Sequence, residues 1–300
     1  MTAFLLLGVF SVCVAIGTPI GTSMCLASIC TLFTTGMGFA MVPYNYYASL
    51  SKFLLLAIPF FIISGDLAAK GKTSQKIVDS INAFVGHIPG GLGIATIFAS
   101  AFFGAITGSA IATVIAIGAL MLPQLIEAGY PRGFSLGIIA CAGTLGVMIP
   151  PSIPMLTMAV ALQESVGRQF IAGVVPGILT SVAMSIYVYF AAKKLKIPSM
   201  PKMGWRQRLH VLKDSIWALL FPVIILGSIY SGLATPTEAA VISAIYVIII
   251  EMLVYKELTW KKLYEQLGPS IVNAATMSVL MATAQTMLWY LTSAHVPEMM

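Results

Sequence analysis

The run GTLGVMIPPSIPM at residues 143–155 lies within apolar sequence long enough to cross a lipid bilayer, yet it contains two glycines and three prolines. Pro150 and Pro151 donate no backbone hydrogen bonds, and Pro151 disfavours helical geometry at Pro150. Ser152 is the type of residue that caps a new helix. We therefore predict that a membrane helix breaks here and restarts after Ser152, with a simple kink as the alternative. Non-helical backbone is tolerated at membrane depth only where protein or a water-filled cavity satisfies its polar groups, so a break points to a binding site.

A second interrupted run, AFFGAITGSAIATVIAIGALMLP, occupies residues 101–123. Residues 91–122 form two apolar runs of about 15 and 13 residues, joined at Thr107-Gly108-Ser109, and each is shorter than the roughly 20 residues that a spanning helix needs. We predict a re-entrant hairpin that enters and leaves the membrane on the same side.

The composition indicates an all-α polytopic membrane protein. Hydrophobic residues make up 59% of the 300 residues and charged residues only 9%, whereas a soluble domain has about 25% charged residues. The four cysteines lie in apolar stretches without the spacing of a zinc site or a disulfide framework, and the three histidines are scattered. We expect no cofactor other than coupling ions.

The distribution of basic residues predicts the orientation. Residues 193–213 hold seven of the sixteen lysines and arginines, which places this loop in the cytoplasm. With 91–122 treated as re-entrant, 14 basic residues fall inside and only Lys52 and Arg168 outside. The net charge of +6 therefore reflects membrane orientation, and nucleic acid is not an expected partner. The predicted spans are roughly 3–16 with 20–40, 53–69, 133–160, 170–192, 215–232, 238–255 and 270–292.

Residues 73–87 have apolar side chains at helical spacing with polar residues between them. This pattern predicts an amphipathic helix, either along the cytoplasmic interface with membrane lipid or packed under the hairpin. Residues 258–267 are expected to form a similar short helix.

Two short words indicate an internal repeat. Gly17-Thr18-Pro19 and Ala234-Thr235-Pro236 are 217 residues apart, and the spans that follow them have opposite predicted orientations. Inverted repeats are common in transporters, with the binding site at their interface. The same shift carries the hairpin tip to 325 and the proline pair to 367, so we expect the second repeat to be incomplete, with chance similarity as the alternative. Residues 295–300 are expected to be a loop that leaves a span.

The hairpin tip and the broken helix contain the candidate binding residues. Hydroxyl groups and freed carbonyls are ligands for a hard cation such as sodium, and the amino end of the second half-helix favours an anionic substrate group. Packing of membrane helices through small residues is the alternative. The candidate residues for sodium and substrate are Thr107, Gly108, Ser109, Ala110, Thr113, Gly143, Thr144, Gly146, Pro150, Pro151 and Ser152.

The acidic residues have simpler explanations. Thr235-Pro236-Thr237-Glu238 predicts a capping box, with a proton carrier as the lesser alternative for Glu238. Asp66 is expected to form a local hydrogen bond or an ion pair with Lys70. A phosphate-binding Walker motif and a nucleophile paired with a base are both missing from the sequence, so we predict a protein that is not an enzyme.

Several of these words occur together in one known family. The series PFFIISGDLAAKGK, VGHIPGGLG, FFGAITGSAIAT, IGALMLPQLIEAGYPRGF, GTLGVMIPPSIPM, IAGVVPGIL and ATPTEAA closely resembles the large membrane subunit of tripartite ATP-independent periplasmic (TRAP) transporters. The resemblance covers roughly residues 1–295.

The resemblance implies a sodium-driven importer of organic acids, such as sialic acid or C4-dicarboxylates, in the bacterial inner membrane. It implies a periplasmic substrate-binding protein and a small four-helix membrane subunit as partners, and an elevator mechanism. Residues 107–110 and 143–152 would line the first sodium site and part of the substrate site. The family pattern continues past residue 300, so a C-terminal truncation is expected. A channel, or a membrane scaffold without transport of its own, are the other hypotheses.

On this basis the chain is expected to have four parts. Residues 1–90 form scaffold-type helices and the interfacial helix of the first repeat, and 91–169 form a transport-type region with the hairpin 91–122 and the broken helix 133–160. Residues 170–214 form a connecting span and the basic loop, and 215–300 begin the inverted second repeat.

Overall fold

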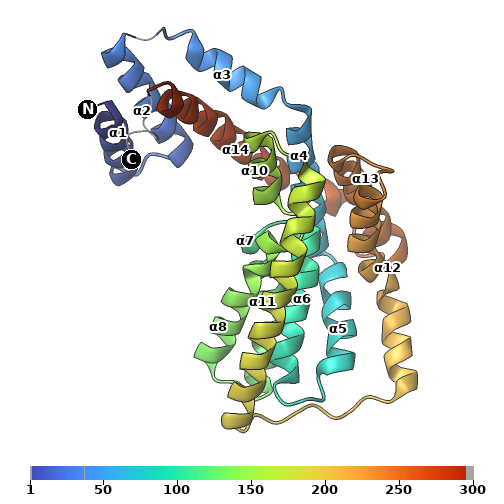
Figure 1. Ribbon diagram of the computed structural model, residues 1–300. Helices are drawn as coiled ribbons and strands as arrows, with labels where there is room; N and C mark the ends of the chain where they lie inside the picture. Colours follow the sequence, from blue (N-terminus) through green and yellow to red (C-terminus); the bar gives the residue numbers. More distant parts are fainter. Residues whose placement is uncertain (1, 37, 295–300) are drawn as a thin grey trace. The chain divides into compact units, whose positions relative to one another are not determined.

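The computed structural model describes residues 2–36 and 38–294, and within these ranges the secondary structure is entirely helical (Figure 1). This confirms the predicted all-α class. Among the described residues, seven segments are long and apolar enough to cross a membrane: 53–70, 110–127, 132–162, 166–194, 205–230, 236–254 and 260–293. The helices are α1 (Thr2–Ala15), α2 (Ile20–Thr35), α3 (Met41–Leu50), α4 (Ala57–Lys70), α5 (Thr73–Val85), α6 (Gly91–Thr107), α7 (Ala110–Glu127), α8 (Arg132–Gly143), α9 (Leu145–Met148), α10 (Ile153–Leu162), α11 (Val166–Lys194), α12 (Trp205–Tyr230), α13 (Pro236–Ile249) and α14 (Trp260–Ser293), with a 3₁₀ turn at Phe53–Leu56 and a π turn at Ile250–Val254.

The chain divides into two compact units, residues 1–55 with 272–300, and residues 56–271. In the first unit, α1, α2 and the end of α14 share a small core of Leu6, Ala27, Leu32 and Tyr290. Glycine at position 21 allows close packing, because a Cβ there would lie 3.3 Å from the Leu280 side chain.

The second unit is built around α6, which contacts α4, α5, α7, α8 and α11 and lies among them in Figure 1. Fifteen of its 17 residues are buried, as expected for a helix that is apolar on every side. Its amino end is held by a hydrogen bond from the Gly93 N–H to the Tyr130 hydroxyl, 3.2 Å long.

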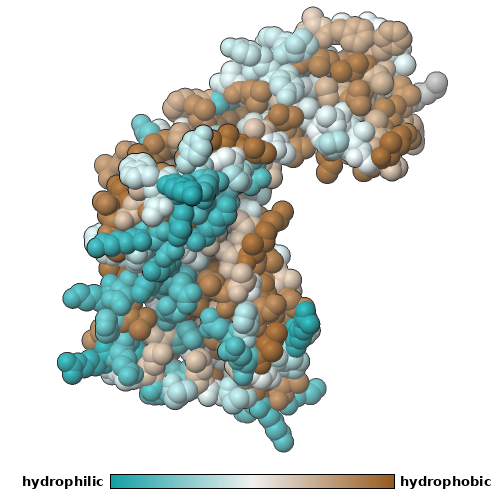
Figure 2. All heavy atoms as spheres, turned by 180° about the vertical axis from the view of Figure 1, so that it is seen from behind, coloured by the Kyte–Doolittle hydropathy of each residue, from teal (hydrophilic) through white to brown (hydrophobic). Residues whose placement is uncertain are grey.

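The outer helices expose apolar side chains, as lipid-facing helices do. On α11 the exposed apolar residues recur at helical spacing, which gives a stripe along its outer face. This stripe on α11 consists of Ile171, Val175, Ile178, Val182, Ile186 and Phe190. Figure 2 shows hydrophilic side chains gathered over one part of the drawn face and apolar side chains exposed over much of the rest.

The α5 helix is packed beside the hairpin, one of the two predicted alternatives. It contacts α6 and α12, and Ile77 and Val78 on its apolar side are buried. Its apolar side is therefore covered by protein over much of its length.

Several helix boundaries differ from the sequence predictions. Residues 205–213, expected within the basic loop, form the first turns of α12, and 260–267 belong to the long helix α14. Lysine, arginine, glutamate and glutamine make up about half of these segments, and they are good helix formers outside the membrane as well. The α7 helix has 18 residues and extends to Glu127, and α3 was not predicted. The expected loop at 295–300 lies outside the described residues.

In each predicted repeat copy a glycine with positive φ precedes the Thr-Pro pair, although Gly17 and Gly232 are not related by the shift of 217 residues. Gly17 and Gly232 both have positive φ, 91° and 74°, and α2 and α13 each start at a Thr-Pro pair. At the second copy the predicted capping box is confirmed: the Thr235 N–H donates to Glu238 Oε2 at 2.8 Å, and the Glu238 N–H donates to Thr235 Oγ1 at 3.3 Å. That structural role accounts for Glu238.

Candidate functional site

The hairpin turns at Gly108 and Ser109. Gly108 has a φ of 61°, and a Cβ at this position would lie 2.9 Å from the Pro151 carbonyl oxygen. Both the left-handed backbone and the close approach favour glycine. Ser109 is extended, and its side chain caps α7 by accepting from the Ala112 N–H at 3.4 Å. Ala110 is the first residue of α7.

The second helix is interrupted in two places. The first break is at Thr144, the one residue between the end of α8 and the start of the short α9. The second break is at residues 149–152, which are not helical and precede α10 at Ile153. The peptide bond between Pro150 and Pro151 is cis. The predicted capping role of the Ser152 side chain is wrong, because its hydroxyl instead donates to the Val147 carbonyl at 2.8 Å. The hydroxyl thus satisfies a carbonyl that the broken helix leaves free.

The hairpin tip and the broken helix contact each other directly. The Ile153 N–H donates to the Gly108 carbonyl at 3.1 Å. A Cβ on Gly104 would lie 2.5 Å from the Gly146 Cα, so the backbones of α6 and α9 touch. Gly143 is likewise packed tightly against the Val114 side chain of α7. The glycines and prolines of both motifs therefore shape one packed junction.

Three oxygen atoms gather at this junction. Thr107 Oγ1 and Thr113 Oγ1 are 3.1 Å apart, and the Ser109 carbonyl oxygen is 3.3 Å from the first and 2.8 Å from the second. Thr107 and Thr113 are buried, at 2% and 0% exposure. We call Thr107, Ser109 and Thr113 the oxygen cluster. Neutral oxygens of this kind are the ligands that hard cations take from proteins.

Gly146 closes one side of the oxygen cluster. A Cβ at this position would lie 2.6 Å from Thr113 Oγ1 and 2.8 Å from the Ser109 carbonyl oxygen. Only a residue without a side chain leaves these oxygens in place. The broken helix therefore contributes its backbone to the same location as the hairpin hydroxyls.

Thr144 is the candidate residue that the structure does not bring to this junction. Its side chain is exposed, and its hydroxyl donates to the Cys141 carbonyl at 2.7 Å. Pro150 and Pro151 are buried, and the Pro151 carbonyl lies beside Gly108 of the hairpin tip.

Asp66 has a partner other than the expected one. The Ser270 hydroxyl donates to Asp66 Oδ2 at 2.7 Å, which joins α4 to α14. Asp66 and Ser270 are 204 residues apart in the sequence, so local sequence patterns do not predict this hydrogen bond.

Glu251 is a residue that the sequence reasoning missed. Its carboxylate, 1% exposed, accepts from the backbone N–H groups of Lys72 and Thr73 at 3.0 and 2.8 Å and from Thr73 Oγ1 at 2.5 Å. Gly71 packs directly against it. The sequence feature that could have identified it is a charged residue in the apolar run VIIIEMLV at 247–254. Ionisable residues within membrane spans are rare and usually have a specific partner or a function.

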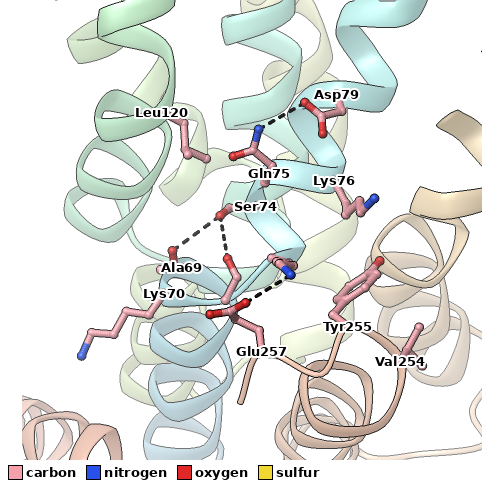
Figure 3. A pocket seen from close by; sticks show the side chains of 12 residues that line it. Ala69, Lys70, Ser74, Gln75, Lys76, Asp79, Leu120, Val254, Tyr255 and Glu257 are labelled. Atoms are coloured by element: carbon pink, nitrogen blue, oxygen red, sulfur yellow. Dashed lines mark hydrogen bonds and ion pairs between the residues drawn. The ribbon is translucent and has the colours of Figure 1, made fainter. Parts of the chain in front are cut away.

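A polar cavity of about 710 Å³ lies at the corner between α4 and α5 (Figure 3). It is lined in part by Gly71, which packs against Glu251. Lys72 Nζ is 3.2 Å from Glu257 Oε2, and Lys76 Nζ is 4.0 Å from Asp214 Oδ2. Burial raises the pKa of Asp79, while its hydrogen bond with Gln75 and the charge of Lys76 oppose the rise. Because these charges are largely paired within the chain, we assign the corner a structural role.

Comparison with known proteins agrees with the sequence resemblance. Residues 7–300 match the family described as the tripartite ATP-independent periplasmic transporter, DctM component. The chain is 41% identical over 246 residues to the C4-dicarboxylate TRAP transporter large permease protein DctM of Pseudomonas aeruginosa, an alignment that covers 82% of this chain and 58% of that protein.

Two further relatives carry other substrate names. The isethionate TRAP transporter permease protein DctMQ of Oleidesulfovibrio alaskensis is 38% identical over 93% of this chain and 44% of its own length. The 2,3-diketo-L-gulonate TRAP transporter large permease protein YiaN of Escherichia coli is 33% identical over all of this chain and 71% of its own length. The chain thus spans about half to 70% of the relatives that it matches.

Proposed function

Because this chain belongs to the family of the DctM component of tripartite ATP-independent periplasmic transporters, we propose that it is a permease for organic acids coupled to sodium. The observation that carries this proposal is the contact between the hairpin tip and the broken helix, with the oxygen cluster buried between them. Sodium is the coupling ion, and the cluster supplies some of its ligands.

The chemistry of the junction supports an anionic substrate. The amino end of α7 begins at the hairpin tip, and the positive end of a helix dipole favours a negative group. The relatives described above are named for a C4-dicarboxylate, for isethionate and for a diketogulonate. A carboxylate, such as a C4-dicarboxylate or sialic acid, is the substrate class that we propose.

The packing supports movement of the hairpin and the broken helix as one body. The close approach of Gly104 to Gly146 and the hydrogen bond between Ile153 and Gly108 join their backbones directly. An elevator mechanism, in which this body moves against a scaffold, follows as a proposal. So do a small four-helix membrane subunit and a periplasmic binding protein as partners, and a bacterial inner membrane with residues 193–213 facing the cytoplasm.

Uptake into proteoliposomes tests the function. The protein would be reconstituted with its small subunit and its binding protein, and labelled C4-dicarboxylate and sialic acid would be supplied outside. We expect concentrative uptake of at least one acid under an inward sodium gradient and none under an equal potassium gradient.

Two results would contradict the proposal. Equal uptake under both gradients would remove sodium coupling. Uptake that stops when internal and external concentrations are equal, and that does not saturate, would identify a channel.

A further inference from the structure

An apolar groove of about 610 Å³ lies between α5, α6 and α12, within the second unit. Apart from Ser80, every residue that lines it is apolar, and Phe84, Phe98, Phe102, Leu219 and Val223 are among them. Val223 is 60% exposed, so the groove opens at the outer surface of α12. In a membrane protein an open groove of this kind is filled by lipid or by another protein.

The buried, positively charged side chain of Arg208 lies near one end of the groove. Arg208 is only 8% exposed, and its guanidinium lies 5.8 Å over the ring of Phe84, which itself lines the groove. Its Nη2 contacts His87 Nδ1 at 3.3 Å, while its Nε is buried without a hydrogen-bond partner. Within residues 2–36 and 38–294, no carboxylate lies at ion-pair distance from Arg208.

This arrangement leaves a buried positive charge without an anion. Burial of a charge costs free energy unless the charge is paired and hydrogen-bonded. An arginine is well suited to a phosphate group, because its guanidinium presents several donors in one plane. The basic residues Lys202, just before α12, and Lys213, within its first turns, would attract an anionic headgroup.

The distances along α12 fit a molecule with one charged and one apolar end. Leu212 lies about one turn beyond Arg208, and Leu226 about 27 Å beyond it at 1.5 Å per residue. The groove itself extends along α12 from Leu212 to Leu226, about 21 Å at 1.5 Å per residue. This is more than half of the apolar thickness of about 30 Å, so the groove is long enough for an acyl chain. We propose that the groove binds an anionic phospholipid, with its phosphate on Arg208 and an acyl chain between α5, α6 and α12. This inference depends on membrane insertion and not on transport.

Native mass spectrometry tests the proposal on the chain released from nanodiscs with equal amounts of phosphatidylglycerol and phosphatidylcholine. We expect the wild-type chain to retain phosphatidylglycerol in preference to phosphatidylcholine. Arg208→Gln should reduce that retention about tenfold, the effect of one charge-assisted hydrogen bond. The matched control is Arg206→Gln, which removes the same charge from an exposed position two residues away and should keep the lipid.

A second pair of variants tests the groove without touching the arginine. Val223→Trp fills the groove from its open side, whereas Val175→Trp places the same side chain on the exposed face of α11, at 62% exposure. We expect Val223→Trp to lose the phospholipid and Val175→Trp to retain it. Inorganic phosphate added in excess should not displace the phospholipid from Val175→Trp.

Three results would overturn the inference. The first is equal retention of phosphatidylglycerol by the two arginine variants, and the second is equal retention of both lipids by the wild type. The third is a polypeptide bound in the groove instead of lipid, which the Val223→Trp variant no longer binds.

Discussion

Replacement of Gly146 by alanine is expected to abolish transport and to lower the free energy of unfolding by about 1–3 kcal/mol, the usual cost of overpacking. The added methyl group would lie 2.6 Å from Thr113 Oγ1 and 2.8 Å from the Ser109 carbonyl oxygen. One of these atoms belongs to the backbone of the hairpin tip, so relief of the clash requires the tip to move. Displacement of a positioned group by about 1 Å costs on the order of a hundredfold in rate.

The control for this variant is Gly137→Ala on α8, where a Cβ meets no atom within 4 Å. An unstrained glycine-to-alanine change stabilises a protein by about 0.4–1 kcal/mol. Sodium-driven uptake and thermal unfolding in detergent would be measured for both variants. Transport by Gly146→Ala at the level of Gly137→Ala would show that the junction does not require this close approach.

Loss of the Glu251 carboxylate is expected to be the most destabilising of the single changes considered, at about 3–5 kcal/mol for Glu251→Ala. The variant leaves two backbone N–H groups without an acceptor, that of Thr73 at a buried position and that of Lys72 at a partly buried one. The exposed ion pair of Lys72 and Glu257 would remain at the corner between α4 and α5, but exposed ion pairs contribute little. Thermal unfolding in detergent is the measurement.

Glu238→Ala is the matched control, because Glu238 also accepts a backbone N–H at a helix start but is exposed to solvent. Loss of that capping interaction should cost about 1 kcal/mol. Glu251→Gln should fall between the two, since the amide keeps the shape and loses the charge. Equal destabilisation by Glu251→Ala and Glu238→Ala would contradict the role given to the buried carboxylate.

Local chemistry explains which parts of the fold were predictable. Pro150 and Pro151 restrict the backbone wherever they occur, and Gly108 permits the left-handed conformation of a turn, so the sequence places the break and the hairpin turn at these residues. The capping box at Glu238 depends on four consecutive residues and was predicted for the same reason. The all-α class was predictable because several apolar segments are long enough to cross a membrane as helices.

Contacts between distant segments explain what the sequence could not supply. Glu251 pairs with residues 178 and 179 positions away, and the approach of Gly146 to the oxygen cluster depends on how α7 and α9 pack. Thr144 shares a motif with Gly146 but its side chain is exposed, and a linear motif does not distinguish the two faces. The charged first turns of α12 resembled a loop because hydropathy detects only the lipid-embedded part of a helix.

Sodium binding by the oxygen cluster is tested most directly by thermal unfolding of the detergent-solubilised chain in sodium chloride against equal potassium chloride. A ligand that binds only the folded state stabilises it, by about 2.7 kcal/mol at a hundred times its Kd. Sodium should raise the Tm of the wild type and of Thr144→Val, whose hydroxyl lies away from the junction. The near-isosteric change Thr113→Val should remove that increase. A sodium-specific increase that persists in Thr113→Val, or one that is absent from the wild type, would contradict the account.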